Sequence, residues 1–142
     1  MGDMVLLGRL HPLLVHFPIG LVILAALAEA VATVAGDCRW RTVAVANVRA
    51  GAASGVLAAI AGWRLALAPG VESSALLESH RWLGAIAAGA AVAAALASSG
   101  ADGQSRFEFW LYRITLFSAA VLVAVTGHFG GLLVWGADFL RP

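Results

Sequence analysis

Four histidines are the residues of this chain whose chemistry stands out: His11, His16, His80 and His128. Imidazole is the commonest metal and haem ligand in proteins, so histidines that converge from separate segments would form a candidate cofactor site. Whether they converge depends on the elements that carry them.

The histidines lie in or beside long apolar stretches. Each stretch is near the ~20 residues that a helix needs to cross the hydrocarbon core of a bilayer. Of the 142 residues, 61% are hydrophobic and only 12% charged, whereas an average soluble domain has about 25% charged residues. We therefore expect an all-α, four-helix transmembrane bundle with up-down-up-down topology, which forms one integral membrane domain over residues 1–142. The expected spans are Leu13–Ala35, Thr42–Ala68, His80–Ser98 and Phe109–Gly136.

Antiparallel threading places all four histidines towards one side of the membrane. We call this side face A; it contains the start of the first span, the end of the second, the start of the third and the end of the fourth. His11 and His16 belong to the first of these positions and His80 to the third, whereas His128 lies about two turns inside the fourth span. The opposite side is face B.

The histidines that lie a short way inside their spans are the preferred ligands. Pro18 predicts an irregularity of the first helix beside His16, and three glycines around His128 would let a flat macrocycle or a neighbouring helix approach the backbone. We therefore expect His16 and His128 to approach each other near face A as haem or metal ligands. His11 with His80 is the remaining pair.

Each of these positions also has a structural interpretation. His16 can bond to a carbonyl that Pro18 frees, and His80, with Ser79 as the expected cap of its helix, can be a solvated interfacial residue. Arg64 and Arg81, also at face A, can receive the carboxylates of a cofactor, or can serve only as interfacial anchors.

Charge gives a weak orientation signal and no sign of nucleic-acid binding. The nine basic residues are all arginines and are scattered along the chain. Five of them belong to face B, and the other four, including Arg141, belong to face A. The positive-inside rule then places face B in the cytoplasm and the histidine face in the periplasm. The N-terminus has no charged n-region or cleavage site, so the first helix is expected to be retained.

One acid lies deep in a span. Glu29 is about two turns from the face B end of the first helix, at a depth similar to that of Arg49 in the second. Because intramembrane charges are costly, we expect the two to face inward and pair, with Arg113 as the alternative partner. Cys38, the only cysteine, lies between the first two spans on face B and is expected to be inert.

Several segments together resemble a known family. The HPLLVHFPIGL opening, AGW at the end of the second span, HRWLG at the start of the third and TGHFGGLLVWG in the fourth are similar to those of an uncharacterised bacterial family of four-helix membrane proteins, some of which are fused to c-type cytochrome modules. The resemblance covers almost the whole chain. It implies a small module of the bacterial inner membrane associated with electron-transfer chains, with His11, His16, His80 and His128 at the matching motif positions.

Three functions follow as hypotheses. The leading one is a b-type cytochrome-like module that binds non-covalent haem b and passes electrons between quinol and a periplasmic c-type cytochrome. The second is a histidine-ligated copper or zinc site. The third is a cofactor-free accessory subunit of a larger bioenergetic membrane complex. The sequence has no CxxCH motif for covalent haem, and no catalytic triad, phosphate-binding loop or paired carboxylates, so hydrolysis and nucleotide chemistry are not expected.

Overall fold

Helices make up the bundle that the sequence predicts. The computed structural model describes residues 8–101, 105–136 and 138; Arg141, counted above on face A, lies outside them. The four long helices are α3 (His16–Ala35), α4 (Cys38–Ala66), α5 (Ala75–Ala97) and α6 (Arg106–Trp135). A short helix, α2 (His11–Leu14), precedes α3, and a 3₁₀ turn, η1 (Ser98–Gly100), follows α5. The expectation of an all-helical fold is confirmed.

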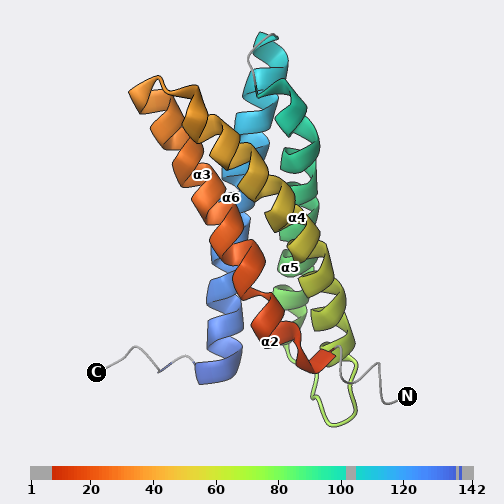
Figure 1. The fold of residues 1–142 in the computed structure, drawn as a ribbon. Coiled ribbons are helices and arrows are strands. Elements are labelled where there is room, and N and C mark those ends of the chain that lie inside the picture. The colour runs from red at the N-terminus through yellow and green to blue at the C-terminus, as the bar shows by residue number, and fades with distance from the viewer. Residues whose placement is uncertain (1–7, 102–104, 137, 139–142) are drawn as a thin grey trace.

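The long helices form a closed, up-down-up-down arrangement (Figure 1). Helix α3 packs against α4 and α6, and α5 likewise packs against α4 and α6, while the short helix α2 rests mainly on α4. The ends of α4 and α6 and the starts of α2, α3 and α5 therefore share one end of the bundle, which is face A. All four histidines belong to this half, as predicted.

The helix boundaries follow from local capping. Gly36 ends α3 in the left-handed conformation, with φ of 66°, which glycine adopts without steric cost. The next helix begins directly, because the Asp37 side chain accepts a hydrogen bond from the Arg39 amide at 2.9 Å. At α5 the capping prediction was wrong. Ser74 is the cap and accepts from the Leu77 amide at 3.1 Å, whereas Ser79 lies inside the helix.

The first helix is interrupted, but not at the proline. A turn at Val15 separates α2 from α3, so Pro18 falls in the first turn of α3, where its missing N–H leaves no intrahelical bond unmade. Pro18 is buried against α4, within contact distance of Gly55. His16 therefore lies beside an irregularity, as predicted, at the start of the long helix.

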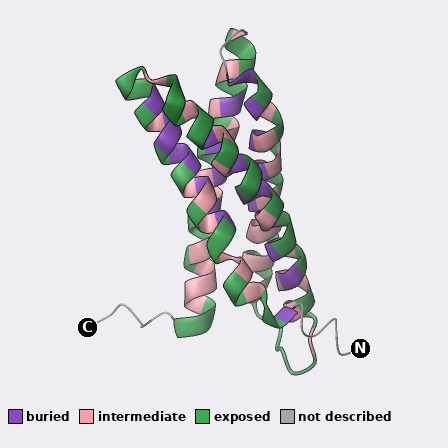
Figure 2. Cartoon of the chain, viewed as in Figure 1, coloured by how far each residue is buried: buried purple, intermediate pink, exposed green. Residues whose placement is uncertain are grey.

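Large apolar side chains cover the outside of the bundle. Val34, Leu96 and Phe107 are 90%, 74% and 75% exposed, and exposed positions dominate the outward faces of all the long helices (Figure 2). All four helices are long and apolar enough to cross a membrane. A soluble monomer rarely exposes such continuous apolar surface, so the outer surface fits lipid and the chain is a membrane protein with four spans.

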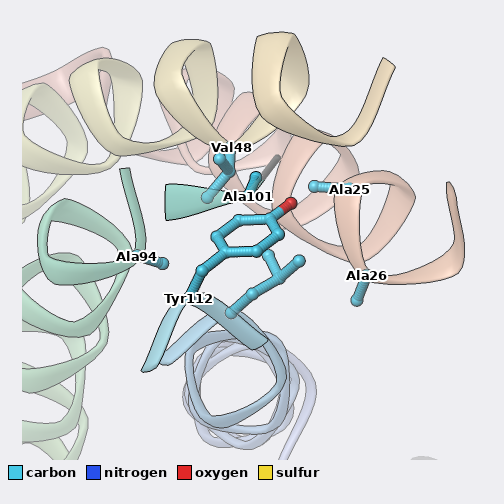
Figure 3. Close-up of a cluster of buried hydrophobic side chains, with 7 residues drawn as sticks. Ala25, Ala26, Val48, Ala94, Ala101 and Tyr112 are labelled. Carbon is cyan, nitrogen blue, oxygen red and sulfur yellow. The ribbon is translucent and has the colours of Figure 1, made fainter. Parts of the chain in front are cut away.

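The interior is filled mainly by small side chains. Alanines dominate the buried positions, and a methyl group on Gly51 would lie 2.8 Å from Val22, so α3 and α4 approach closely there. Tyr112 is the largest fully buried side chain. Its ring lies in a cluster that includes Val48 and Ala94, and its hydroxyl points towards α3 beside Ala25 (Figure 3).

Candidate histidine site

The structure brings His11 and His80 together at face A. Their ring centroids lie 6.1 Å apart with an angle of 75° between the ring planes. His11 comes from α2 and His80 from α5, so two segments far apart in the sequence meet here. Both side chains are half-buried.

A backbone carbonyl fixes the orientation of each ring. His11 Nδ1 lies 2.9 Å from the Ala58 carbonyl oxygen, and His80 Nδ1 lies 3.2 Å from that of Thr126. Because a carbonyl oxygen only accepts hydrogen bonds, Nδ1 carries the proton in both rings. The neutral ring then presents the lone pair of Nε2, which is the tautomer that metal-ligating histidines commonly adopt.

Glycine makes both carbonyls approachable. In an α-helix the carbonyl of residue i accepts from the amide of residue i+4, and residue i+4 is Gly62 after Ala58 and Gly130 after Thr126. A methyl group on Gly62 would lie 2.6 Å from His11 Cε1, and one on Gly130 would lie 3.1 Å from His80 Cε1. Each imidazole therefore occupies the space beside a helix that any other residue would fill with its side chain.

These two glycines were not recognised in their observed role. Gly130 was interpreted as one of several small residues that surround His128, and Gly62 was seen only as part of the AGW segment. The sequence feature that could have indicated this role is a glycine four residues after a carbonyl that accepts from a histidine. It occurs on a helix that faces a segment with a histidine. That signal becomes specific only when the packing of the helices is known.

His16 and His128 are not brought together in this way. Both side chains are exposed on the outside of the chain. The aromatic neighbour of the His128 ring is the adjacent Phe129, with ring centroids 6.4 Å apart. No group of three or more histidine, cysteine or acidic side chains with metal-binding geometry occurs within the described residues. The histidines that meet are thus the pair that the sequence ranked second.

The two candidate arginines differ in their positions. Arg81 is partly buried, with its guanidinium 4.2 Å from the centroid of the Trp63 ring and 4.0 Å from Glu78. Its Nε atom is buried and makes no hydrogen bond to the part of the chain that the structure describes. Trp63 also meets Trp82 edge-on, with centroids 5.4 Å apart. Arg64, by contrast, is exposed.

The deep acid on the other half of the bundle faces inward, as predicted. Glu29 is fully buried and lies 3.2 Å from Arg41 and 3.4 Å from Arg113. The alternative partner is therefore confirmed, but the expected pairing with Arg49 is wrong. Arg49 is exposed and donates to the Ser98 hydroxyl at 3.0 Å, because its position on α4 directs it towards α5 rather than α3.

The fold and the intramembrane charges define the class: a polytopic α-helical membrane protein with four spans. Residues 9–139 match the family model described as "Predicted membrane protein (DUF2231)", and the chain belongs to that family. Searches of curated proteins and of solved structures found no match.

Proposed function

We propose that this chain is a small electron-transfer module in which His11 and His80 would hold the iron of a non-covalent haem b. The observation that carries the proposal is the meeting of two imidazoles whose Nδ1 atoms are both held by backbone carbonyls. This arrangement leaves Nε2 of each ring as the atom for an iron ion.

The donor set fits such a group. The two imidazoles would hold the iron through their Nε2 atoms, and the structure already brings the two rings within 6.1 Å of each other, centroid to centroid. Arg81 follows His80 in the sequence, and its Nε, which makes no hydrogen bond to the described residues, offers a donor for a haem propionate. Haem would supply one-electron transfer, and the protein would supply the ligands and an apolar setting.

The position of the histidines in the membrane supports a role in electron transfer between a lipid-soluble and a water-soluble electron carrier. Both histidines lie near the face A boundary, where quinol within the bilayer and a periplasmic c-type cytochrome outside it can approach. We assign the chain to the bacterial inner membrane, with face B in the cytoplasm. The slight excess of arginines on face B, five against four on face A, favours this orientation.

One observation favours a second occupant, a copper or zinc ion. The His11 and His80 rings are packed directly on the backbones of Gly62 and Gly130. A single ion between two imidazoles would need less rearrangement of these contacts than a macrocycle. Solvent or a partner would then complete the coordination, because the described residues hold no third ligand in position.

The test begins with the purified protein in detergent. Oxidised and reduced absorption spectra, a pyridine haemochrome assay and elemental analysis distinguish haem from copper or zinc. Haem b at about one per chain supports the first proposal, and stoichiometric copper or zinc supports the second. A protein with neither would be assigned to the accessory-subunit class.

The ligands are then tested by substitution. His11→Ala and His80→Ala should each abolish the low-spin reduced-minus-oxidised spectrum, because each removes one of the two imidazoles that would hold the iron. His16→Ala and His128→Ala are the matched controls, since their exposed rings lie outside the pair. Loss of the spectrum in the controls alone would reject the assignment in favour of the pair that the sequence ranked first.

A further inference from the structure

Two arginines near face B share one carboxylate. Arg41 and Arg113 both approach the fully buried carboxylate of Glu29. Two cations and one anion leave a net charge of +1 on this cluster. Because an uncompensated charge in a low-dielectric setting is costly, the cluster favours a negatively charged ligand.

Both arginines keep hydrogen-bond donors that the chain does not use. Arg41 donates from Nε and Nη2 to Glu29, at 3.2–3.3 Å. Arg113 donates from Nη2 to the hydroxyl of Thr33. Within the described residues, the Nη1 group of each arginine donates to no acceptor.

An aromatic ring holds the two guanidinium groups together. The guanidinium carbons of Arg41 and Arg113 lie 5.1 Å and 5.0 Å from the centroid of the Phe109 ring. Each guanidinium is thus fixed both by this cation–π contact and by Glu29. Two fixed guanidinium groups with unused N–H donors match the oxygens of a phosphate group.

The depth of the cluster indicates where such a phosphate comes from. Helix α6 has 30 residues and is about 45 Å long, whereas the hydrocarbon core is about 30 Å thick. Arg113 lies about 10 Å from the start of α6, which is close to the boundary between acyl chains and headgroups. Trp40 and Trp110, 44% and 52% exposed, lie at the same end of the bundle, and exposed tryptophans prefer this boundary.

We propose that Arg41 and Arg113 form a binding site for the phosphate of an anionic phospholipid. A phosphodiester carries one negative charge, which balances the net charge of the Glu29 cluster. Phosphatidylglycerol has this headgroup chemistry without the positive charge that phosphatidylcholine adds. A free phosphate ion has the same oxygens, but the depth of the arginines favours the lipid.

The experiment compares three additives with the delipidated full-length protein in detergent. Thermal unfolding is followed with dioleoylphosphatidylglycerol, dioleoylphosphatidylcholine or inorganic phosphate, and native mass spectrometry counts the lipids retained. The Arg113→Gln variant keeps Arg41 on Glu29 as a neutral pair. Arg106→Gln, an exposed arginine at the same end of α6, is the matched control.

Phosphatidylglycerol should raise the Tm of the wild type and of Arg106→Gln more than phosphatidylcholine does. Arg113→Gln should bind it about tenfold or more weakly, since it loses a charge-assisted contact. Should this variant fail to fold, Arg113→Lys provides the second test, because lysine keeps the positive charge beside Glu29 but lacks the forked donors of guanidinium, and it should bind phosphatidylglycerol more weakly than the wild type does. Equal responses of Arg113→Gln and wild type, or an Arg113-dependent response to inorganic phosphate alone, would overturn the lipid assignment.

Discussion

The imidazole of His11 occupies the space that a side chain at position 62 would need, and Gly62 is the residue that leaves it open. The contact matters because it lets the ring reach the Ala58 carbonyl, which accepts a hydrogen bond from His11 Nδ1. The absence of a side chain at position 62 of α4 thus allows the hydrogen bond that fixes the tautomer and the position of the His11 imidazole on α2.

This relationship predicts an order of effects for glycine substitutions. Gly62→Ala should destabilise the protein by about 1–3 kcal/mol, since its methyl group would displace His11. Gly130→Ala should cost less, because its methyl group would lie 3.1 Å from His80 rather than 2.6 Å from His11. Thermal unfolding in detergent provides the measurement.

Gly89→Ala is the control for that series. Nothing lies within 4 Å of a methyl group at this exposed position of α5. Alanine there should be neutral or stabilise the helix by up to about 1 kcal/mol. Equal effects at positions 62 and 89 would show that the His11 contact is not maintained in the membrane protein.

The Glu29 cluster predicts a large cost for removing its carboxylate. Glu29→Gln should destabilise the protein by about 3–5 kcal/mol, because two partly buried guanidinium groups lose their shared anion. Glu72→Gln, in an exposed segment, should change stability by less than about 0.5 kcal/mol. A mild effect at Glu29 would mean that the arginines reorient towards the headgroups without loss of packing.

The buried hydroxyl of Tyr112 predicts that its removal does not destabilise the protein. Its hydroxyl is buried and makes no hydrogen bond to the described residues. Tyr112→Phe should therefore be neutral or stabilise the protein by up to about 1 kcal/mol, because it removes a polar group that is desolvated without a partner. Tyr112→Ala should cost about 3–5 kcal/mol through the cavity that it leaves. Destabilisation by the phenylalanine variant would reveal a bound water on the hydroxyl.

Cys38 provides a direct test of orientation. It is exposed at the start of α4, at face B. If face B is cytoplasmic, a membrane-impermeant maleimide should label it only after the cells are broken. The double variant Cys38→Ser with Ser73→Cys moves the thiol to an exposed position at face A, where intact spheroplasts should react. The reverse labelling pattern would place the histidine pair in the cytoplasm.

Hydropathy and charge predicted the number of helices, their topology and the shared side of the histidines, because each depends only on position along a span. The pairing of side chains depends also on rotation about each helix axis. An α-helix turns by 100° per residue, and these helices are apolar on nearly all sides, so hydropathy did not indicate the rotation of the histidines. His16 and His128 lie in the same half of the bundle, but both side chains face outward.

The same reason explains the partial success at Glu29. Its inward direction followed from the cost of a charge in lipid, which leaves a single favourable face. Its partner depended on reach and rotation together. Because α4 begins at Cys38, earlier than the expected Thr42, Arg49 lies deeper than Glu29. Arg41 lies nearer the membrane boundary, and its long side chain extends back to the carboxylate.

The turn at Val15 separates α2, which carries His11, from the four long helices of the bundle. Helix α2 is held through α4, and α3, α4, α5 and α6 make their closed set of contacts without it. A substitution in α2 should therefore move the His11 ring away from the Ala58 carbonyl without opening the packing of the four long helices.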